Sequence, residues 1–248
     1  MVHHEDFWDT IAKNVDIYRA DIAKLSERTI YFVDGSSIKA DAILLGTGFK
    51  DSVIPFFTKE QCIDLGLPHK EVEEDPKETA YWKDLDTKAT KEVLARLPPL
   101  ASPPSIPKDH GDVPALTPFR MYHTIAPLHD TSIAFIGLPA VPNMFAGSEI
   151  EAMWVTAYFD GVVKLPSEEE MRTQIAYQNA YMRLRVPTYG RQGNWYLFDY
   201  FPFLDTLAEE MGLTMKRKGW WAELTQPLFT SDLAPLRKEY LRKYGKSS

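Results

Sequence analysis

The sequence predicts a mixed α/β chain that is mostly helical and carries only a small sheet. Helix-capping patterns followed by apolar residues at helical spacing dominate the second half of the chain. Short strand-like runs lie mainly before residue 46, and residues 98–118 hold seven of the 18 prolines, which favours an extended connector. We therefore expect a single domain over 1–248, with strands in 1–58, a polar region and the connector in 59–118, and helices with one further strand in 119–248.

The composition is that of a globular protein without a nucleic-acid partner. Of the 248 residues, 44% are hydrophobic and 25% charged, and the net charge of −7 disfavours non-specific binding to nucleic acid or anionic lipid. Cys62 is the one cysteine, so no internal disulfide can form. With no signal-peptide pattern and no apolar run of membrane-spanning length, we expect a cytoplasmic protein without a membrane span.

The first elements are a short helix over 4–14 and three strand-like segments. The segments are Asp16–Tyr18, Thr29–Val33 and Ala42–Leu45. The last is continuously apolar, which is typical of a strand buried on both faces of a sheet. Residues 59–92 are polar and are expected to be helical in part.

The second half opens with a further buried strand, Ser132–Ile136, and continues in helices. Ser148 with Glu151 forms one capping-box pattern, before a helix over 149–163. Ser167 with Glu170 forms another, before a helix over 168–185. Two more helices are expected near 202–211 and 233–243.

No complete nucleotide or metal site is visible in the sequence. Gly46-Thr47-Gly48 follows a predicted strand, but the third position of a dinucleotide fingerprint is occupied by Asp51, which favours a tight turn over a phosphate cradle. The histidines lack the spacing of metal ligands, and no nucleophile elbow is present. We expect no cofactor and no metal.

Two segments carry candidate chemistry. The residues from Asn143 to Glu149 lead into the helix at Ser148, whose free N–H groups could polarise a carbonyl; the alternative is a helix that is merely capped. Arg120, Tyr122 and His123 combine a fixed cation, a phenol and a group that titrates near neutrality. The alternative there is a loop anchored by Arg120 to the acidic body of the protein.

Four segments together resemble the flavin-containing monooxygenases, especially the fungal ones. They are Ala40–Phe49, Arg120–Pro127, Ser132–Gly137 and Glu149–Trp154. The resemblance implies that the sheet is a remnant of a flavoprotein fold with two dinucleotide-binding domains. It also implies that the chain corresponds to the C-terminal half of such an enzyme, without the N-terminal FAD fingerprint and the NADPH domain.

The resemblance leaves two explanations open. In the first, the chain is a cofactor-independent enzyme that catalyses a cyclisation or isomerisation, including pericyclic reactions of the Diels–Alderase kind, of an apolar small molecule in fungal natural-product biosynthesis. In the second, it is a partial flavin monooxygenase that needs a partner chain for FAD, or a non-catalytic binding protein. Bare strand edges favour a homodimer. The expected catalytic residues are Asn143, Arg120 and His123, and the expected substrate-binding residues are Tyr122, Phe145, Ser148, Glu149, Trp154 and Tyr158.

Overall fold

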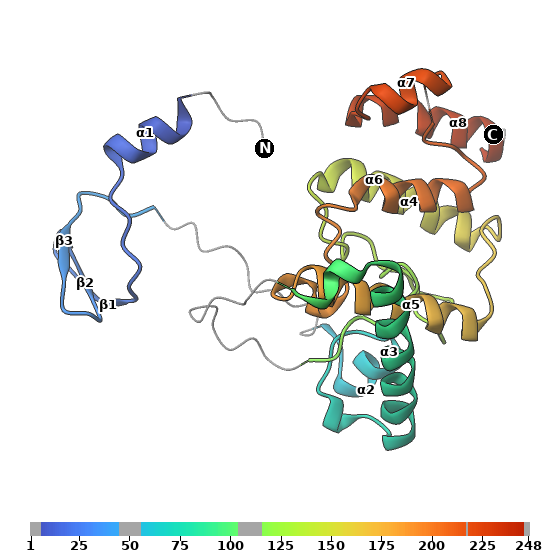
Figure 1. The fold of residues 1–248 in the computed structure, drawn as a ribbon, viewed down its shortest axis with the longest axis horizontal. Coiled ribbons are helices and arrows are strands. Elements are labelled where there is room, and N and C mark those ends of the chain that lie inside the picture. The colour runs from blue at the N-terminus through green and yellow to red at the C-terminus, as the bar shows by residue number, and fades with distance from the viewer. Residues whose placement is uncertain (1–5, 45–55, 104–115, 217, 246–248) are drawn as a thin grey trace. The chain divides into compact units, whose positions relative to one another are not determined.

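The computed structural model describes residues 6–44, 56–103, 116–216 and 218–245, and the chain forms two compact units, 1–51 and 52–248. The single domain expected over 1–248 stays a prediction. Helices dominate the described residues, and the one sheet has three strands (Figure 1). The expected mostly helical α/β composition is confirmed.

Unit 1 contains a short helix and an antiparallel sheet. The helix α1 spans Phe7–Asn14, and the strands are β1 (Ile22–Ser26), β2 (Thr29–Phe32) and β3 (Ser37–Lys39), paired in the order β1-β2-β3. Asp34 closes the turn between β2 and β3, because its carboxylate accepts a hydrogen bond of 2.9 Å from the backbone N–H of Ser36.

Two strand predictions in this unit are wrong. Residues 16–18 form no strand, and residues 42–44 form none either, with Leu44 98% exposed. An apolar run is buried only where strands pair with both of its edges, and the described sheet consists of β1 to β3 alone. Leu45 and the predicted turn at Gly46 to Gly48 lie outside the described residues.

The regular elements in the described residues of unit 2 are all helices, which are joined by irregular loops. Its α-helices are α2 (Lys59–Asp64), α3 (Pro76–Arg96), α4 (Met144–Phe159), α5 (Glu168–Arg185), α6 (Tyr200–Glu210), α7 (Trp220–Thr225) and α8 (Pro235–Tyr244). Short 3-10 turns occur at Glu71–Glu73, Pro98–Ala101, Tyr189–Gln192 and Thr230–Leu233. The helices expected near 202–211 and 233–243 are therefore confirmed as α6 and α8. The start of the proline-rich connector forms a 3-10 turn, and residues 104–115 lie outside the described part.

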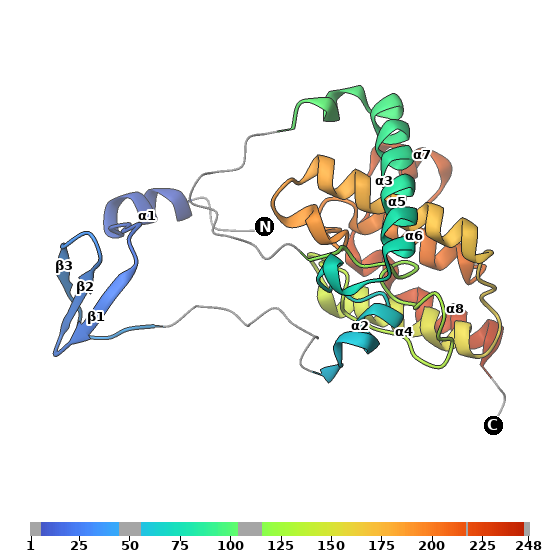
Figure 2. The same cartoon turned by 90° about the horizontal axis from the view of Figure 1, so that it is seen from below.

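Helices α3 and α5 lie side by side (Figures 1 and 2). Trp82 and Val93 of α3 pack with Ile175 and Ala180 of α5 in one apolar cluster. The capping box at the start of α5 is confirmed: the Ser167 hydroxyl accepts from the N–H of Glu170, whose carboxylate accepts the N–H of Ser167. Local hydrogen bonding thus fixes where α5 begins, and packing against α3 fixes which face it buries.

Helix α4 begins earlier than the sequence predicts. Its N-cap is Asn143, whose side-chain oxygen accepts a hydrogen bond of 3.2 Å from the N–H of Ala146, and Ser148 lies inside the helix. The predicted capping box fails because Glu151 is buried and accepts the N–H of Gly137 at 2.6 Å. A tertiary contact has taken the carboxylate that the cap would need.

The main core joins α4, α6 and α8. Trp154, Leu204 and Leu236 are among its fully buried side chains. The strand predicted at Ser132–Ile136 is wrong, because this segment is an irregular stretch whose Phe135 N–H bonds to the carbonyl of Ile125 at 2.9 Å. Within the described part of the chain, no helix has the length and apolar character needed to cross a bilayer.

Candidate functional site

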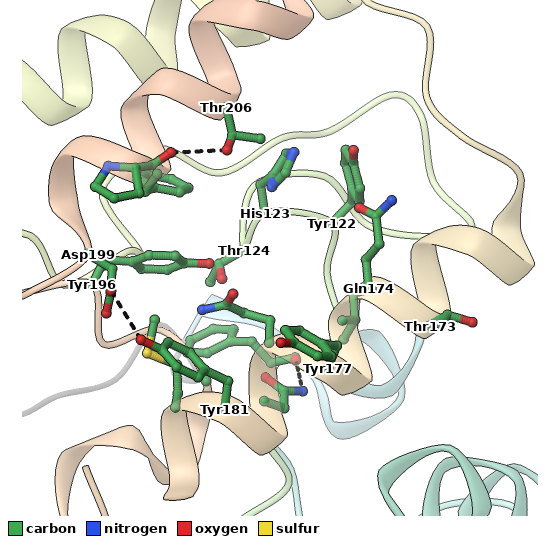
Figure 3. A pocket seen from close by; sticks show the side chains of 18 of the residues that line it. Tyr122, His123, Thr124, Thr173, Gln174, Tyr177, Tyr181, Tyr196, Asp199 and Thr206 are labelled. Atoms are coloured by element: carbon green, nitrogen blue, oxygen red, sulfur yellow. Dashed lines mark hydrogen bonds between the residues drawn. The ribbon is translucent and has the colours of Figure 1, made fainter. Parts of the chain in front are cut away.

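Unit 2 contains a cavity of about 620 Å³ between α5, α6 and the loop that carries residues 119–124 (Figure 3). This volume lies within the range of about 300–1,000 Å³ that is typical of small-molecule sites. The C-terminal end of α3 borders it at Arg96 and Leu97. Its wall is largely aromatic and apolar, with Phe119, Tyr177, Tyr181, Met182, Tyr196 and Phe203 among the lining residues.

A strained loop brings His123 to this cavity. His123 and Thr124 have φ angles of 54° and 62°, in the left-handed region that costs a non-glycine residue, and most of all a β-branched one, conformational energy. Two backbone hydrogen bonds close the loop. The N–H of Tyr122 donates to the carbonyl of Ala126 at 2.8 Å, and the N–H of Ala126 donates to the carbonyl of Tyr122 at 3.0 Å. The structure thus maintains a costly backbone conformation at the position where the imidazole meets the cavity.

The carboxylate of Glu210 organises the side chains behind this loop. One oxygen accepts from the Tyr122 hydroxyl at 2.6 Å and from Nε2 of His123 at 2.8 Å, and the other accepts from the Trp154 indole N–H at 2.7 Å. Burial works to raise the pKa of Glu210, but the hydrogen bonds from His123, Tyr122 and Trp154 outweigh it and hold the pKa below its ordinary value. Glu210 is therefore an anion at neutral pH.

This arrangement selects the tautomer of His123. Because Nε2 donates to Glu210, the neutral imidazole carries its free lone pair on Nδ1. A histidine held in this way at an apolar cavity can act as a general base and, once protonated, as a general acid.

Hydroxyl groups lie on the cavity wall next to His123. The phenol of Tyr196 points toward Thr124, and burial raises the pKa of Tyr196 to about 12, so the phenol keeps its proton at neutral pH. Farther along the wall, the Tyr181 hydroxyl donates to Asp199 at 3.3 Å, and Arg185 holds the same carboxylate at 2.6 Å. Figure 3 shows the phenol of Tyr196 directed toward Thr124 in the middle of the site.

Arg120 does not line this cavity. Its guanidinium pairs with Glu74 and lies over the Trp82 ring, with 4.9 Å to the ring centroid. The side chains are 10% and 3% exposed for Arg120 and Glu74, so the pair is buried. This geometry corresponds to the anchored loop that was the alternative to a catalytic role.

The other predicted site residues are divided between two places. Asn143, Phe145 and Glu149 line a separate hollow of about 360 Å³ between α4 and the Leu233 to Arg237 segment. Ser148 lines neither hollow. Trp154 and Tyr158 stack in the core with ring centroids 5.6 Å apart. Trp154 does not line the cavity, but its ring lies 5.9 Å from the ring of the lining residue His123, and its indole N–H donates to Glu210. The structure thus unites Tyr122, His123 and Trp154, and leaves the α4 N-terminus apart from them.

Sequence reasoning missed Glu210 and Tyr196. A weak signal exists for Glu210, since it lies three residues after Leu207 and so borders the buried stripe of α6. A carboxylate at that position needs a partner, but the helix pattern does not say which one. Tyr196 lies among several aromatic residues in the last quarter of the chain, and no local pattern distinguishes it from them.

The comparisons with known proteins agree with the predicted resemblance. Residues 117–233 match the model of the FMO-like family, described as flavin-binding monooxygenase-like. The chain is related to the flavin-containing monooxygenases. The region matched includes the His123 loop, Glu210 and nearly all of the cavity wall.

Several fungal and animal proteins are similar to this chain. It is 31% identical to the FAD-dependent monooxygenase rstn6 of Aspergillus nomiae, over 88% of this chain and 38% of the relative. It is 32% identical to the FAD-dependent monooxygenase DEP4 of Fusarium langsethiae, over 86% of this chain and 37% of the relative. Human flavin-containing monooxygenase 2 is 34% identical over 37% of this chain and 17% of its own length. The chain spans about two-fifths of the length of the fungal relatives.

The described residues do not by themselves fit a flavin dinucleotide. A pyrophosphate needs a glycine loop between a strand and a helix, where the backbone can approach the phosphates. None of the described glycines lies in a loop that leads from a strand into a helix. Gly66 and Gly190 instead lie close to this chain's own backbone, at the carbonyls of Arg120 and Met182. Across the same residues, no group of three or more His, Cys, Asp or Glu side chains is placed to hold a metal ion.

Proposed function

We propose that this chain is a cofactor-independent enzyme, built on a scaffold related to flavin monooxygenases, that isomerises or cyclises an apolar, carbonyl-bearing small molecule. The observation that carries the proposal is the His123–Glu210 pair at the wall of an aromatic cavity of about 620 Å³. The fungal monooxygenases among the similar proteins favour natural-product biosynthesis as the setting. The substrate occupies the cavity, with its carbonyl toward Thr124 and Tyr196.

The chemistry follows from the side chains at the site. Nδ1 of His123 removes a proton from the carbon next to the carbonyl, while a hydrogen bond from Tyr196 or Thr124 stabilises the oxygen that becomes negative. One such hydrogen bond can contribute about 2.7–4 kcal/mol, and a positioned base accelerates a reaction by about 10²–10⁴-fold. The imidazolium returns its proton at another carbon, which completes an isomerisation with no net change in oxidation state.

The same cavity suits a pericyclic cyclisation. Its aromatic wall would hold a flexible chain in a folded conformer, and in the best intramolecular cases such positioning lowers a barrier by about 7–11 kcal/mol. The hydroxyl pair of Tyr196 and Thr124 would polarise a carbonyl conjugated to the reacting alkene. A Diels–Alderase-like reaction would therefore depend on Tyr196 and less on His123.

The test follows proton exchange on a probe ketone. The protein is incubated in D2O with 2-decalone, an apolar bicyclic ketone, and the loss of the proton signals next to the carbonyl is followed by NMR. His123→Ala should slow exchange about 100-fold or more, and Glu210→Gln should slow it to a smaller extent. Thr173→Ala, on the cavity wall, is the matched control and should leave the rate unchanged. No exchange by the wild-type protein, or equal rates in wild type and His123→Ala, would refute the proton-transfer mechanism.

A second candidate is a role as part of a flavin monooxygenase. It is favoured by the names of the fungal relatives and by the share of their length that this chain spans. In that case a partner chain, or further sequence, would supply the binding site for the FAD pyrophosphate. The visible absorption spectrum of the purified protein before and after addition of FAD distinguishes the two candidates. A stoichiometric, tightly held flavin would refute the cofactor-independent enzyme, whereas cofactor independence requires a spectrum without bound flavin.

A further inference from the structure

We propose that the C-terminal end of unit 2 binds the surface of an anionic lipid bilayer. The contact is a tryptophan patch made of Trp220, Trp221, Leu224 and Phe229. Helix α7 buries none of its residues, and Trp220 and Trp221 are 74% and 64% exposed. Their rings meet edge to face, with centroids 5.4 Å apart, and form one apolar projection. Leu224 and Phe229 are exposed as well.

A bilayer surface suits this projection better than water does. Tryptophan is enriched where membrane meets water, because its ring is apolar and its N–H still reaches the polar headgroups. A short amphipathic segment of this kind lies in the interface plane and does not span the membrane. Two adjacent exposed indoles beside leucine and phenylalanine form more than the single apolar residues that are scattered over ordinary protein surfaces.

The charge of the C-terminal segment points to anionic lipid. Residues 213–248 carry eight lysines and arginines against three acids, a net charge of +5, although the whole chain carries −7. Two of the acids are engaged within this end: Asp232 pairs with Lys218 at 3.1 Å, and Glu223 accepts the N–H of Lys218. Exposed cations remain at Lys216, Arg237, Lys238 and Arg242.

The placement of α7 and α8 allows one membrane surface to meet both the tryptophan patch and the exposed cations. Helices α7 and α8 lie at the same end of unit 2, at the top of Figure 1. Helix α8 is anchored to the core by Leu236 and Tyr240, while Arg237 and Lys238 stay exposed. A second copy of this chain that met the patch with the same face would bring an equal positive charge, whereas an anionic membrane brings the opposite charge over its whole surface.

Co-sedimentation with vesicles tests the proposal on the full chain. Vesicles of phosphatidylcholine alone are compared with vesicles of phosphatidylcholine and phosphatidylserine at low salt. We expect binding to the anionic vesicles only. The double variant Trp220→Ser/Trp221→Ser should bind about tenfold more weakly or worse, and so should Arg237→Gln/Lys238→Gln. Trp8→Ser is the matched control, since Trp8 is also 64% exposed but belongs to unit 1, and it should bind like wild type.

Three results would overturn the proposal. The first is no binding to anionic vesicles, and the second is binding that neither double variant weakens. The third is a wild-type dimer that Trp220→Ser/Trp221→Ser converts to a monomer without any effect on vesicle binding, because the patch would then join two copies. Circular dichroism of each variant shows whether the fold is retained, and the outcome does not depend on the activity proposed for the cavity.

Discussion

Replacing Arg120 by methionine should destabilise the protein strongly and should change catalysis little. Methionine keeps most of the side-chain volume but removes the charge that pairs with Glu74. The Glu74 carboxylate is 3% exposed, and its remaining partners are the Thr79 hydroxyl at 3.0 Å and the nearby His69, 3.6 Å away. The variant would therefore leave a buried anion without its main counter-charge.

The magnitude follows from this burial. Removing one partner of a buried ion pair costs about 3–5 kcal/mol, because the other charge stays desolvated. The packing of Arg120 over Trp82 adds to the loss. For a domain the size of unit 2, about 3 kcal/mol corresponds to a fall of roughly 6–12 °C in the melting temperature. Lys88→Met is the matched control, since Lys88 pairs with Asp84 on an exposed surface of the same helix, where a pair is worth about 0.3–0.5 kcal/mol.

The unfolding free energy is measured by urea titration on both variants. Their activity is measured as the rate of proton exchange on 2-decalone, well below the melting temperature. The double variant Glu74→Gln/Arg120→Met should recover part of the lost stability, because it removes the unpaired charge. If Arg120→Met unfolds at the same urea concentration as Lys88→Met but loses activity, the anchoring interpretation is wrong. Arg120 would then act on the substrate.

Two further predictions concern α4. Asn143→Ala should lower the unfolding free energy by about 1 kcal/mol, whereas Ser148→Ala, inside the helix, should lower it far less. Urea titrations measure both losses, with Ser167→Ala as the positive control for a lost cap. Equal losses for Asn143→Ala and Ser148→Ala would contradict the assignment of Asn143 as the cap. Burial raises the pKa of Glu151 above its ordinary value of 4.5, despite the N–H bond from Gly137, so ionisation of this group costs stability as the pH rises above about 4.5. Glu151→Gln should therefore gain stability relative to wild type between pH 4 and pH 7, and a pH-independent difference in unfolding free energy would contradict this.

The sequence by itself determined the elements whose signals are local. The Ser167 capping box joins residues three apart, and it predicted the start of α5 correctly. The helical patterns that became α6 and α8 are likewise carried by neighbouring residues. The motifs that resemble flavin monooxygenases also lie along the chain, and the comparisons confirmed the relationship. Within the candidate site, the sequence indicated Tyr122 and His123 as a pair, because they are adjacent.

Only the tertiary structure decided which distant residues meet. Glu210 lies 88 positions after Tyr122, and no helix pattern could predict that its carboxylate would gather Tyr122, His123 and Trp154. The strand predictions at 42–44 and 132–136 failed for the same reason, since a strand needs partners that its own residues do not specify. The sequence predicted that Glu151 would take part in a helix cap, but in the fold Glu151 is buried and accepts a hydrogen bond from the N–H of Gly137. Short-range hydrogen bonds are fixed by neighbours in the sequence, whereas desolvation and charge pairing depend on the whole fold.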